Sequence, residues 1–184
     1  MKVCIVDFYD SFTYNLQHYI EAIGHEVDVW YDHEVDIDAI ATYDAIILSP
    51  GPGIPSECLS IMPILKRYGD SKRILGVCLG MQGLVEFFGG SIYNLEKVRH
   101  GIQVDVHLQQ DKIWEGLPST IQVGLYHSWA CALQSDGSLT QIAEDAEGVC
   151  MAVRHSNGLI YGVQFHPESI LTPMGKEILQ NFLR

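Results

Sequence analysis

The stretch RILGVCLGMQGLVEFFGG, residues 73–90, contains the local pattern that decides the fold. Its first five residues are a short apolar run, which is typical of a buried parallel strand. A helix is expected over residues 79–88, and Gly89 and Gly90 end it. A strand that leads at once into a helix indicates a βα unit of a parallel sheet.

The rest of the first half repeats this alternation of strands and helices. Strands are expected at 2–6, 25–31 and 45–49, and helices at 12–23 and within 57–68, where Pro63 can break or kink the helix.

The second half consists of short strand-like runs followed by one helix. The runs are 103–108, 120–126, 139–143, 149–155 and 159–165, and the helix is expected at 174–183. We therefore predict an α/β fold: an open, mostly parallel sheet flanked by helices, with a C-terminal antiparallel extension. Since neither repeats nor a long linker interrupt the chain, residues 1–184 are predicted to form a single domain.

Charge and composition exclude several classes of protein. The chain carries 11 Lys and Arg against 23 Asp and Glu, a net charge of −12, so it has no basic footprint for nucleic acid or for an anionic membrane surface. It has no apolar run of about 18 residues, and its start, MKVCIVDFYDSF, is typical of a strand and not of a signal peptide. We expect a cytoplasmic protein.

Five cysteines are present, an odd number without a CxxC pair, which argues against a disulfide framework or a zinc site. We expect neither a metal nor a cofactor. The remaining question is whether one of the cysteines is reactive.

Cys78 is the strongest candidate for a nucleophile. It is the centre of Gly76-Val77-Cys78-Leu79-Gly80, between a predicted strand and a predicted helix, as in a nucleophile elbow. The N-terminus of the helix stabilises a thiolate at this position. The alternative is an unreactive buried cysteine in a tight turn.

His166 is the candidate base, since it is predicted to end a strand and Glu168 follows two residues later. Residues i and i+2 of an extended segment point the same way, so Glu168 can orient the imidazole, with Pro167 fixing the backbone between them. The alternative is an incidental histidine at a strand end.

Acyl transfer also needs an oxyanion hole. The backbone N–H of Leu79, directly after the nucleophile, is the first expected donor. The loop 50–53, Pro-Gly-Pro-Gly, follows a predicted strand at the same sheet edge, and the N–H of Gly53 is the second. An ordinary Pro/Gly turn is the alternative interpretation of this loop.

Four motifs together resemble the class I glutamine amidotransferase family. They are LSPGPG (48–53), GVCLGMQ (76–82), YHSW (126–129) and GVQFHPES (162–169), in the order that the family uses. The opening VDFYDSFTYNL (6–16) and the tail ESILTPMGKEILQNFL (168–183) are similar to the branch that contains the glutaminase subunits of anthranilate synthase and aminodeoxychorismate synthase.

The resemblance implies a Cys78–His166–Glu168 triad that hydrolyses L-glutamine to glutamate and ammonia through a Cys thioester. It also implies a set of substrate-binding residues: Gly51, Pro52, Gly53, Gln82, Ser128 and Trp129. Three features depart from the family pattern: Met81 stands where His is usual, Leu125 where a basic residue is usual, and IQVDVHL after Gly101 replaces a more basic loop.

A partner is implied because the chain is too short to hold a chorismate site as well. The expected partner is a chorismate-binding synthase subunit that receives the ammonia. Tyr9, Phe12 and Tyr14 are candidates for the interface or the ammonia exit, with core packing an equal alternative for Phe12. Two other functions remain open: a stand-alone γ-glutamyl hydrolase or peptidase with the same triad, and a non-catalytic binding relic of the fold.

Overall fold

The computed structural model describes residues 1–135 and 137–184, in which nine strands form one continuous sheet. The strands are β1 (Lys2–Asp7), β2 (Glu26–Tyr31), β3 (Ala45–Leu48), β4 (Arg73–Val77), β5 (Ser91–Leu108), β6 (Thr120–Ala132), β7 (Leu139–Asp145), β8 (Cys150–His155) and β9 (Ile160–Val163). The α-helices are α1 (Thr13–Ala22), α2 (Ile61–Tyr68), α3 (Leu79–Phe87) and α4 (Gly175–Phe182).

The sheet order is β2-β1-β3-β4-β9-β8-β7-β5-β6. The first five strands in this order are parallel to their neighbours, and the pairs from β9 onward are antiparallel. This confirms the predicted parallel sheet with an antiparallel extension. The position of β9 in the sequence predicts that it belongs to the antiparallel extension, yet this strand pairs in parallel with β4 at the centre of the sheet.

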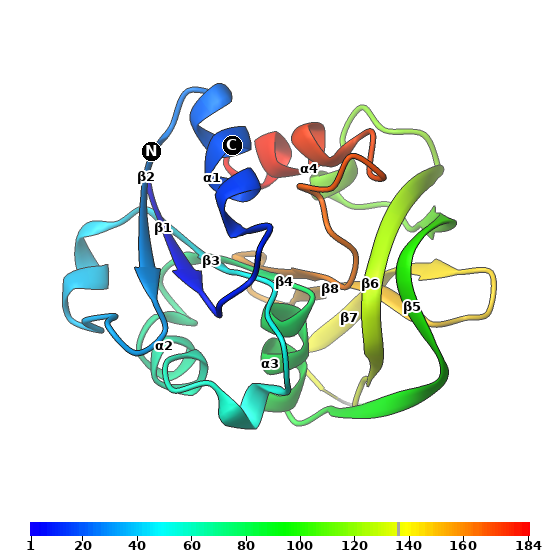
Figure 1. Ribbon diagram of the computed structural model, residues 1–184, viewed down its shortest axis with the longest axis horizontal. Coiled ribbons are helices and arrows are strands. Elements are labelled where there is room, and N and C mark those ends of the chain that lie inside the picture. Colours follow the sequence, from blue (N-terminus) through cyan, green and yellow to red (C-terminus); the bar gives the residue numbers. More distant parts are fainter. Residues whose placement is uncertain (136) are drawn as a thin grey trace.

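Helices cover both faces of the parallel part, with α1 and α4 on one face and α2 and α3 on the other (Figure 1). The alternation of side chains along β1 shows how one strand serves both layers. Val3 and Ile5 belong to the core under α1 and α4, whereas Cys4 and Val6 belong to the core under α2 and α3. Strands buried on both faces are continuous apolar runs for this reason.

Two elements of the antiparallel extension differ from their predicted extents. β5 begins at Ser91 instead of 103, and its register with β6 shifts between Asn94 and Arg99 and again between His100 and Ile102. Because the pairing is irregular and most side chains of β5 are exposed, its sequence lacks the regular alternation of apolar and polar residues from which a strand is predicted. β6 extends to Ala132, so the YHSW motif is part of a strand.

Pro63 does not break α2. It is the third residue of the helix, in the first turn, where the backbone N–H that proline lacks has no intrahelical partner.

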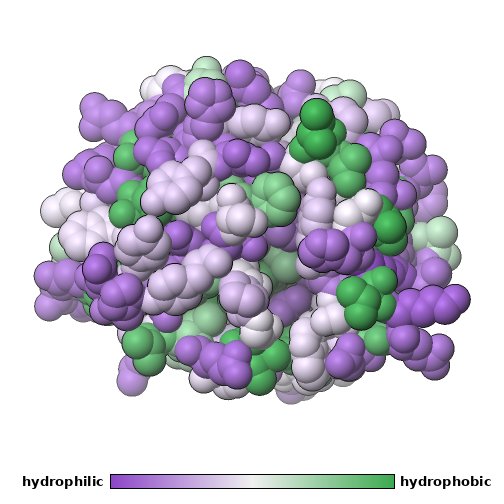
Figure 2. Space-filling view, viewed as in Figure 1, coloured by the Kyte–Doolittle hydropathy of each residue, from purple (hydrophilic) through white to green (hydrophobic). Residues whose placement is uncertain are grey.

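Hydrophilic residues cover most of the face seen in Figure 2, and hydrophobic residues form small separate patches on it. Residues of intermediate hydropathy gather over β1 and β2 on this face. In the described part of the chain, all helices are too short or too polar to span a membrane.

Candidate active site

Cys78 occupies a strained turn between β4 and α3. Its backbone has φ 51° and ψ −102°, in the left-handed region that residues other than glycine rarely adopt. The flanking glycines are required by packing: a Cβ on Gly76 would lie 2.5 Å from the carbonyl carbon of Gly80, and a Cβ on Gly80 would lie 2.8 Å from the Cβ of Leu48. The turn places Cys78 at the N-cap of α3, directly before its first residue, Leu79.

The parallel pairing of β9 with β4 brings His166 to Cys78. The Cys78 N–H donates to the Val163 carbonyl at 2.8 Å, which fixes the end of β9 beside the elbow. The chain then crosses toward β6, where the His166 N–H donates to the Gly124 carbonyl at 3.1 Å. Thr172 Oγ1 donates to the His166 carbonyl at 2.7 Å. These bonds set the backbone of His166 on two sides.

The side chains of His166 and Glu168 contact one another as a buried pair. Nδ1 of His166 lies 2.7 Å from Oε1 of Glu168, and both residues are buried. Burial opposes protonation of His166, but its interactions with Cys78 and Glu168 outweigh burial and raise the pKa of the imidazole well above its usual value. Within the described residues, Nε2 of His166 is buried and has no hydrogen-bond partner.

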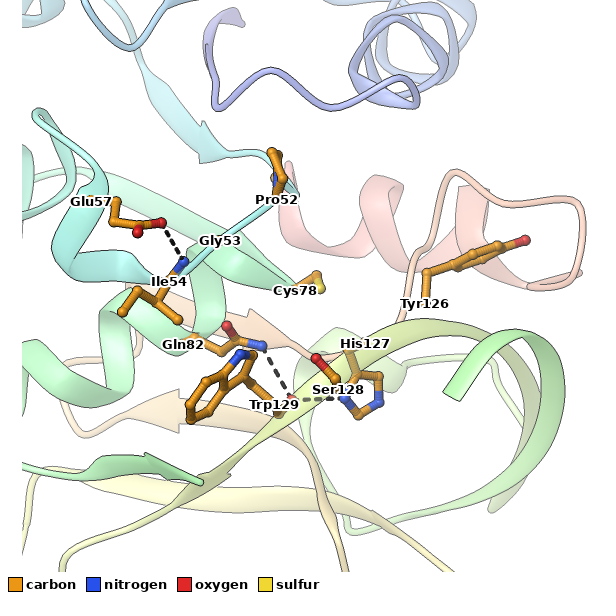
Figure 3. Close-up of a pocket in the computed structure, with 11 residues that line it drawn as sticks. Pro52, Gly53, Ile54, Glu57, Cys78, Gln82, Tyr126, His127, Ser128 and Trp129 are labelled. Atoms are coloured by element: carbon orange, nitrogen blue, oxygen red, sulfur yellow. Dashed lines mark hydrogen bonds between the residues drawn. The ribbon is translucent and has the colours of Figure 1, made fainter. Parts of the chain in front are cut away.

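A pocket of about 290 Å³ opens beside Cys78. In Figure 3 the sulfur lies between the 52–54 loop on one side and the 126–129 segment on the other. Every residue predicted to bind substrate lines this pocket: Gly51, Pro52, Gly53, Gln82, Ser128 and Trp129. The pocket is also lined by four residues for which the sequence predicts no substrate-binding role: Ile54, Glu57, Tyr126 and His127.

The two predicted oxyanion donors come from different elements: Gly53 lines the pocket, and Leu79 directly follows Cys78 in the chain. Leu79 is the first residue of α3, so its N–H lacks an intrahelical acceptor. Gly53 has φ +82°, a conformation that suits glycine, in a loop held by the Ile54 N–H, which donates to Glu57 Oε2 at 3.3 Å (Figure 3).

The carbonyl of Trp129 organises the opposite wall. It accepts from Gln82 Nε2 at 3.3 Å and from His127 Nδ1 at 2.7 Å (Figure 3). Burial lowers the pKa of His127 to about 4, so its imidazole is neutral at pH 7 and carries its proton on Nδ1. His127 was missed because a histidine inside the YHSW motif gives no sign that its side chain bonds to its own strand.

A second cavity, of about 360 Å³, adjoins the first at Cys78. Four residues line both cavities: Gly51, Pro52, Cys78 and Tyr126. Phe12 and Tyr126 pack around His166, with ring centroids 5.9 and 4.9 Å from the imidazole. Phe12 is half-buried, so it both packs against the site and borders the cavity.

The departures from the family pattern lie away from the pocket. Met81 is fully buried and packs in a small core with Val85 and Val153, and a Cβ on Gly162 would lie 2.8 Å from its Cγ. Leu125 is buried in the main core. The IQVDVHL segment is regular strand paired with β6.

One group of side chains could offer ligands to a metal. Asp10, His166 and Glu168 have ligand atoms within 4.8 Å of one another. Two of these groups already contact each other, since His166 Nδ1 lies 2.7 Å from Glu168 Oε1.

The sheet order and the Cys78 turn define an α/β protein with a cysteine at a strand–helix elbow. The family model for class I glutamine amidotransferases matches residues 4–184. The chain is 39% identical to aminodeoxychorismate/anthranilate synthase component 2 of Bacillus subtilis, over 98% of this chain and 95% of the relative. It is also 39% identical to anthranilate synthase component 2 of Thermus thermophilus, over 100% of this chain and 92% of that relative.

A solved structure of a glutamine amidotransferase from Thermotoga maritima matches with a TM-score of 0.81 at 15% identity, covering 100% of this chain and 96% of that one, which shows the shared fold. The chain belongs to the class I glutamine amidotransferase family, and it is an enzyme of that family.

Proposed function

We propose that this chain is a glutaminase subunit that hydrolyses L-glutamine to glutamate and supplies the ammonia to a chorismate-using synthase subunit. One observation carries the proposal: Cys78 lies at the N-terminus of α3, with the buried His166–Glu168 pair beside it, at a pocket lined by all the expected substrate-binding residues. The names of the relatives, component 2 of anthranilate and aminodeoxychorismate synthases, support the same function.

In the proposed first half-reaction, Sγ of Cys78 attacks the side-chain amide carbon of glutamine, and the thiol proton passes to Nε2 of His166. The C–N bond then breaks, and His166 gives this proton to the leaving ammonia. A glutamyl thioester remains on Cys78. The N–H groups of Leu79 and Gly53 would bind the oxyanion that forms at the carbonyl.

In the second half-reaction, water attacks the thioester and gives a proton to His166. The C–S bond breaks, the proton returns to Cys78, and glutamate leaves. Glu168 accepts the hydrogen bond from Nδ1 of His166 throughout, which orients the ring and stabilises the imidazolium. The raised pKa of His166 supports this role, because the site stabilises the protonated ring that both half-reactions require.

The second cavity and the tyrosines beside it are proposed to face the synthase subunit. Tyr9, Tyr14 and Tyr31 are exposed, and the rings of Tyr9 and Tyr31 stack with centroids 5.9 Å apart. Tyr9 also lines the second cavity, which adjoins the glutamine pocket and shares Cys78 with it. We propose that ammonia released at Cys78 leaves through this cavity toward the partner. The partner would use the ammonia to make anthranilate, 4-amino-4-deoxychorismate or both.

The test is glutamine hydrolysis by the purified chain, alone and with anthranilate and aminodeoxychorismate synthase subunits, for the wild type and for Cys78→Ser. The expected result is glutamate production that a synthase subunit stimulates and that Cys78→Ser abolishes. Full activity on γ-glutamyl peptides without a partner would instead establish the stand-alone hydrolase. Hydrolysis that survives Cys78→Ser would refute the proposed nucleophile.

A further inference from the structure

Gln164 is a fully buried amide next to the proposed nucleophile, and the mechanism above leaves it without a role. Its Nε2 lies 3.5 Å from Sγ of Cys78, within the range of an N–H···S hydrogen bond. We propose that Gln164 is a catalytic residue that donates this hydrogen bond to the Cys78 sulfur and stabilises its thiolate. The inference deepens the proposed glutaminase function and rests on it.

The positions of the oxygen and nitrogen in the Gln164 amide follow from a chain of contacts that begins at a backbone carbonyl. The backbone carbonyl of Trp129 can only accept, so the atom of Gln82 that lies 3.3 Å from it is the amide nitrogen. The same nitrogen lies 3.4 Å from Gln164, whose facing atom must therefore be the acceptor Oε1. The other end of the Gln164 amide, which faces Cys78, is then the NH₂ group.

A second contact agrees with this orientation. Sγ of Cys131 lies 4.0 Å from Oε1 of Gln164, where a thiol can donate weakly to an oxygen. Reversing the amide would turn an NH₂ group toward that thiol and toward the NH₂ group of Gln82, and would turn a carbonyl oxygen toward Cys78. The network satisfies its donors and acceptors in one arrangement only.

The hydrogen bond from Gln164 has a chemical consequence at the sulfur. A bond to a charged acceptor is stronger than a bond to a neutral one, so the N–H favours thiolate over thiol. Gln164 transfers no proton during the reaction: the thiol proton still goes to His166, and the amide keeps both of its hydrogens. It is a fixed dipole directed at a charge, in a buried place where water cannot replace it.

Alkylation of the isolated chain by iodoacetamide tests this without requiring glutaminase activity. The other cysteines will not compete between pH 5 and 9, because burial raises the pKa of Cys4, Cys58 and Cys150 to about 12 and that of Cys131 well above its usual value. Peptide mapping then gives the labelling rate of one thiol, Cys78, as a function of pH.

Two variants remove the donor in different ways. Gln164→Met keeps the length of the side chain in a residue that packs adaptably, and Gln164→Glu keeps the shape and the acceptor but sets a carboxylate against the sulfur. In both, the pH midpoint of Cys78 labelling is expected to rise by about one unit or more, with about a tenfold lower rate on the acidic side. The rise should be larger for Gln164→Glu.

Cys131→Ala is the matched control, since it changes a contact on the other side of Gln164 and leaves the donor to Cys78 in place. Its labelling midpoint should equal that of the wild type. Urea unfolding identifies which Gln164 variants are folded, and the pH midpoint of Cys78 labelling is measured on those variants. A folded Gln164 variant with the wild-type midpoint would overturn the proposal.

Glutamine hydrolysis separates this inference from the function on which it rests. The Gln164 variants should lose kcat with little change in KM, because the bond acts on the reacting sulfur. A wild-type chain that labels at Cys78 but hydrolyses no glutamine with any synthase subunit would refute the proposed function while the midpoint shift still decides the role of Gln164.

Discussion

The buried ion pair between Arg99 and Asp145 is predicted to be a large contributor to stability. Arg99 is 8% exposed and Asp145 6%, and the guanidinium binds Oδ2 of Asp145 while its other arm reaches Glu147, whose side chain is exposed. Oδ1 of Asp145 is already used by the N–H groups of Glu147 and Val149, at 2.9 Å each. Removing Arg99 therefore leaves a buried carboxylate charge without a cation.

Arg99→Met is expected to lower the free energy of unfolding by about 3–5 kcal/mol, the range for breaking one side of a buried pair. The exposed ion pair between Arg99 and Glu147 should contribute no more than about 1 kcal/mol to this loss, and Glu147→Gln measures that contribution separately. Lys2→Met is the matched control, because it breaks a solvent-exposed pair with Asp28, 3.1 Å apart, and should change stability little. Urea unfolding followed by circular dichroism gives all three values. An Arg99→Met loss no larger than that of Lys2→Met would refute the reasoning.

Two further predictions concern the elbow and the pocket wall. Gly80→Ala should lower the urea midpoint by the equivalent of about 1–3 kcal/mol, because its Cβ would press on the backbone of β3 near Leu48, and an unchanged midpoint would show that the elbow tolerates the methyl group. For His127, burial lowers the pKa to about 4, so the unfolded chain binds a proton near pH 6.5 that the folded chain does not. The stability due to the neutral ring is complete above pH 6.5 and falls as the pH drops toward 4. Between pH 7 and pH 5 the wild type should lose about 2 kcal/mol more than His127→Gln in urea unfolding, and equal losses would contradict the buried neutral ring.

The sequence allowed the parallel half of the fold to be predicted nearly residue by residue. Most of its strands are apolar runs, and glycine or proline marks several of its turns, so local patterns determine much of this half. β5 could not be predicted in the same way, because its pairing with β6 is interrupted by register shifts that follow from long-range contacts.

Some residues of the site could likewise be predicted from the sequence, and others could not. Cys78 and the adjacent His166 and Glu168 stand out by their spacing, and the structure brings all three together. Gln164 and His127 did not stand out, since their bonds to Cys78 and Trp129 depend on which strands become neighbours. Gln164, two residues before His166, indicates no role until β9 is known to lie next to β4.

The central strand of the sheet, β9, is the last strand of the chain to be synthesised. This strand separates the four strands made first from the four that form the opposite half of the sheet, so the two halves share no ladder without it. In a growing chain, the residues of β4 and the elbow are made while β9, Gln164 and His166 are still absent. The thiol at residue 78 therefore meets its proposed base and its proposed amide donor only when nearly the whole polypeptide has been made. If both proposals hold, the reactive form of Cys78 arises together with the finished sheet.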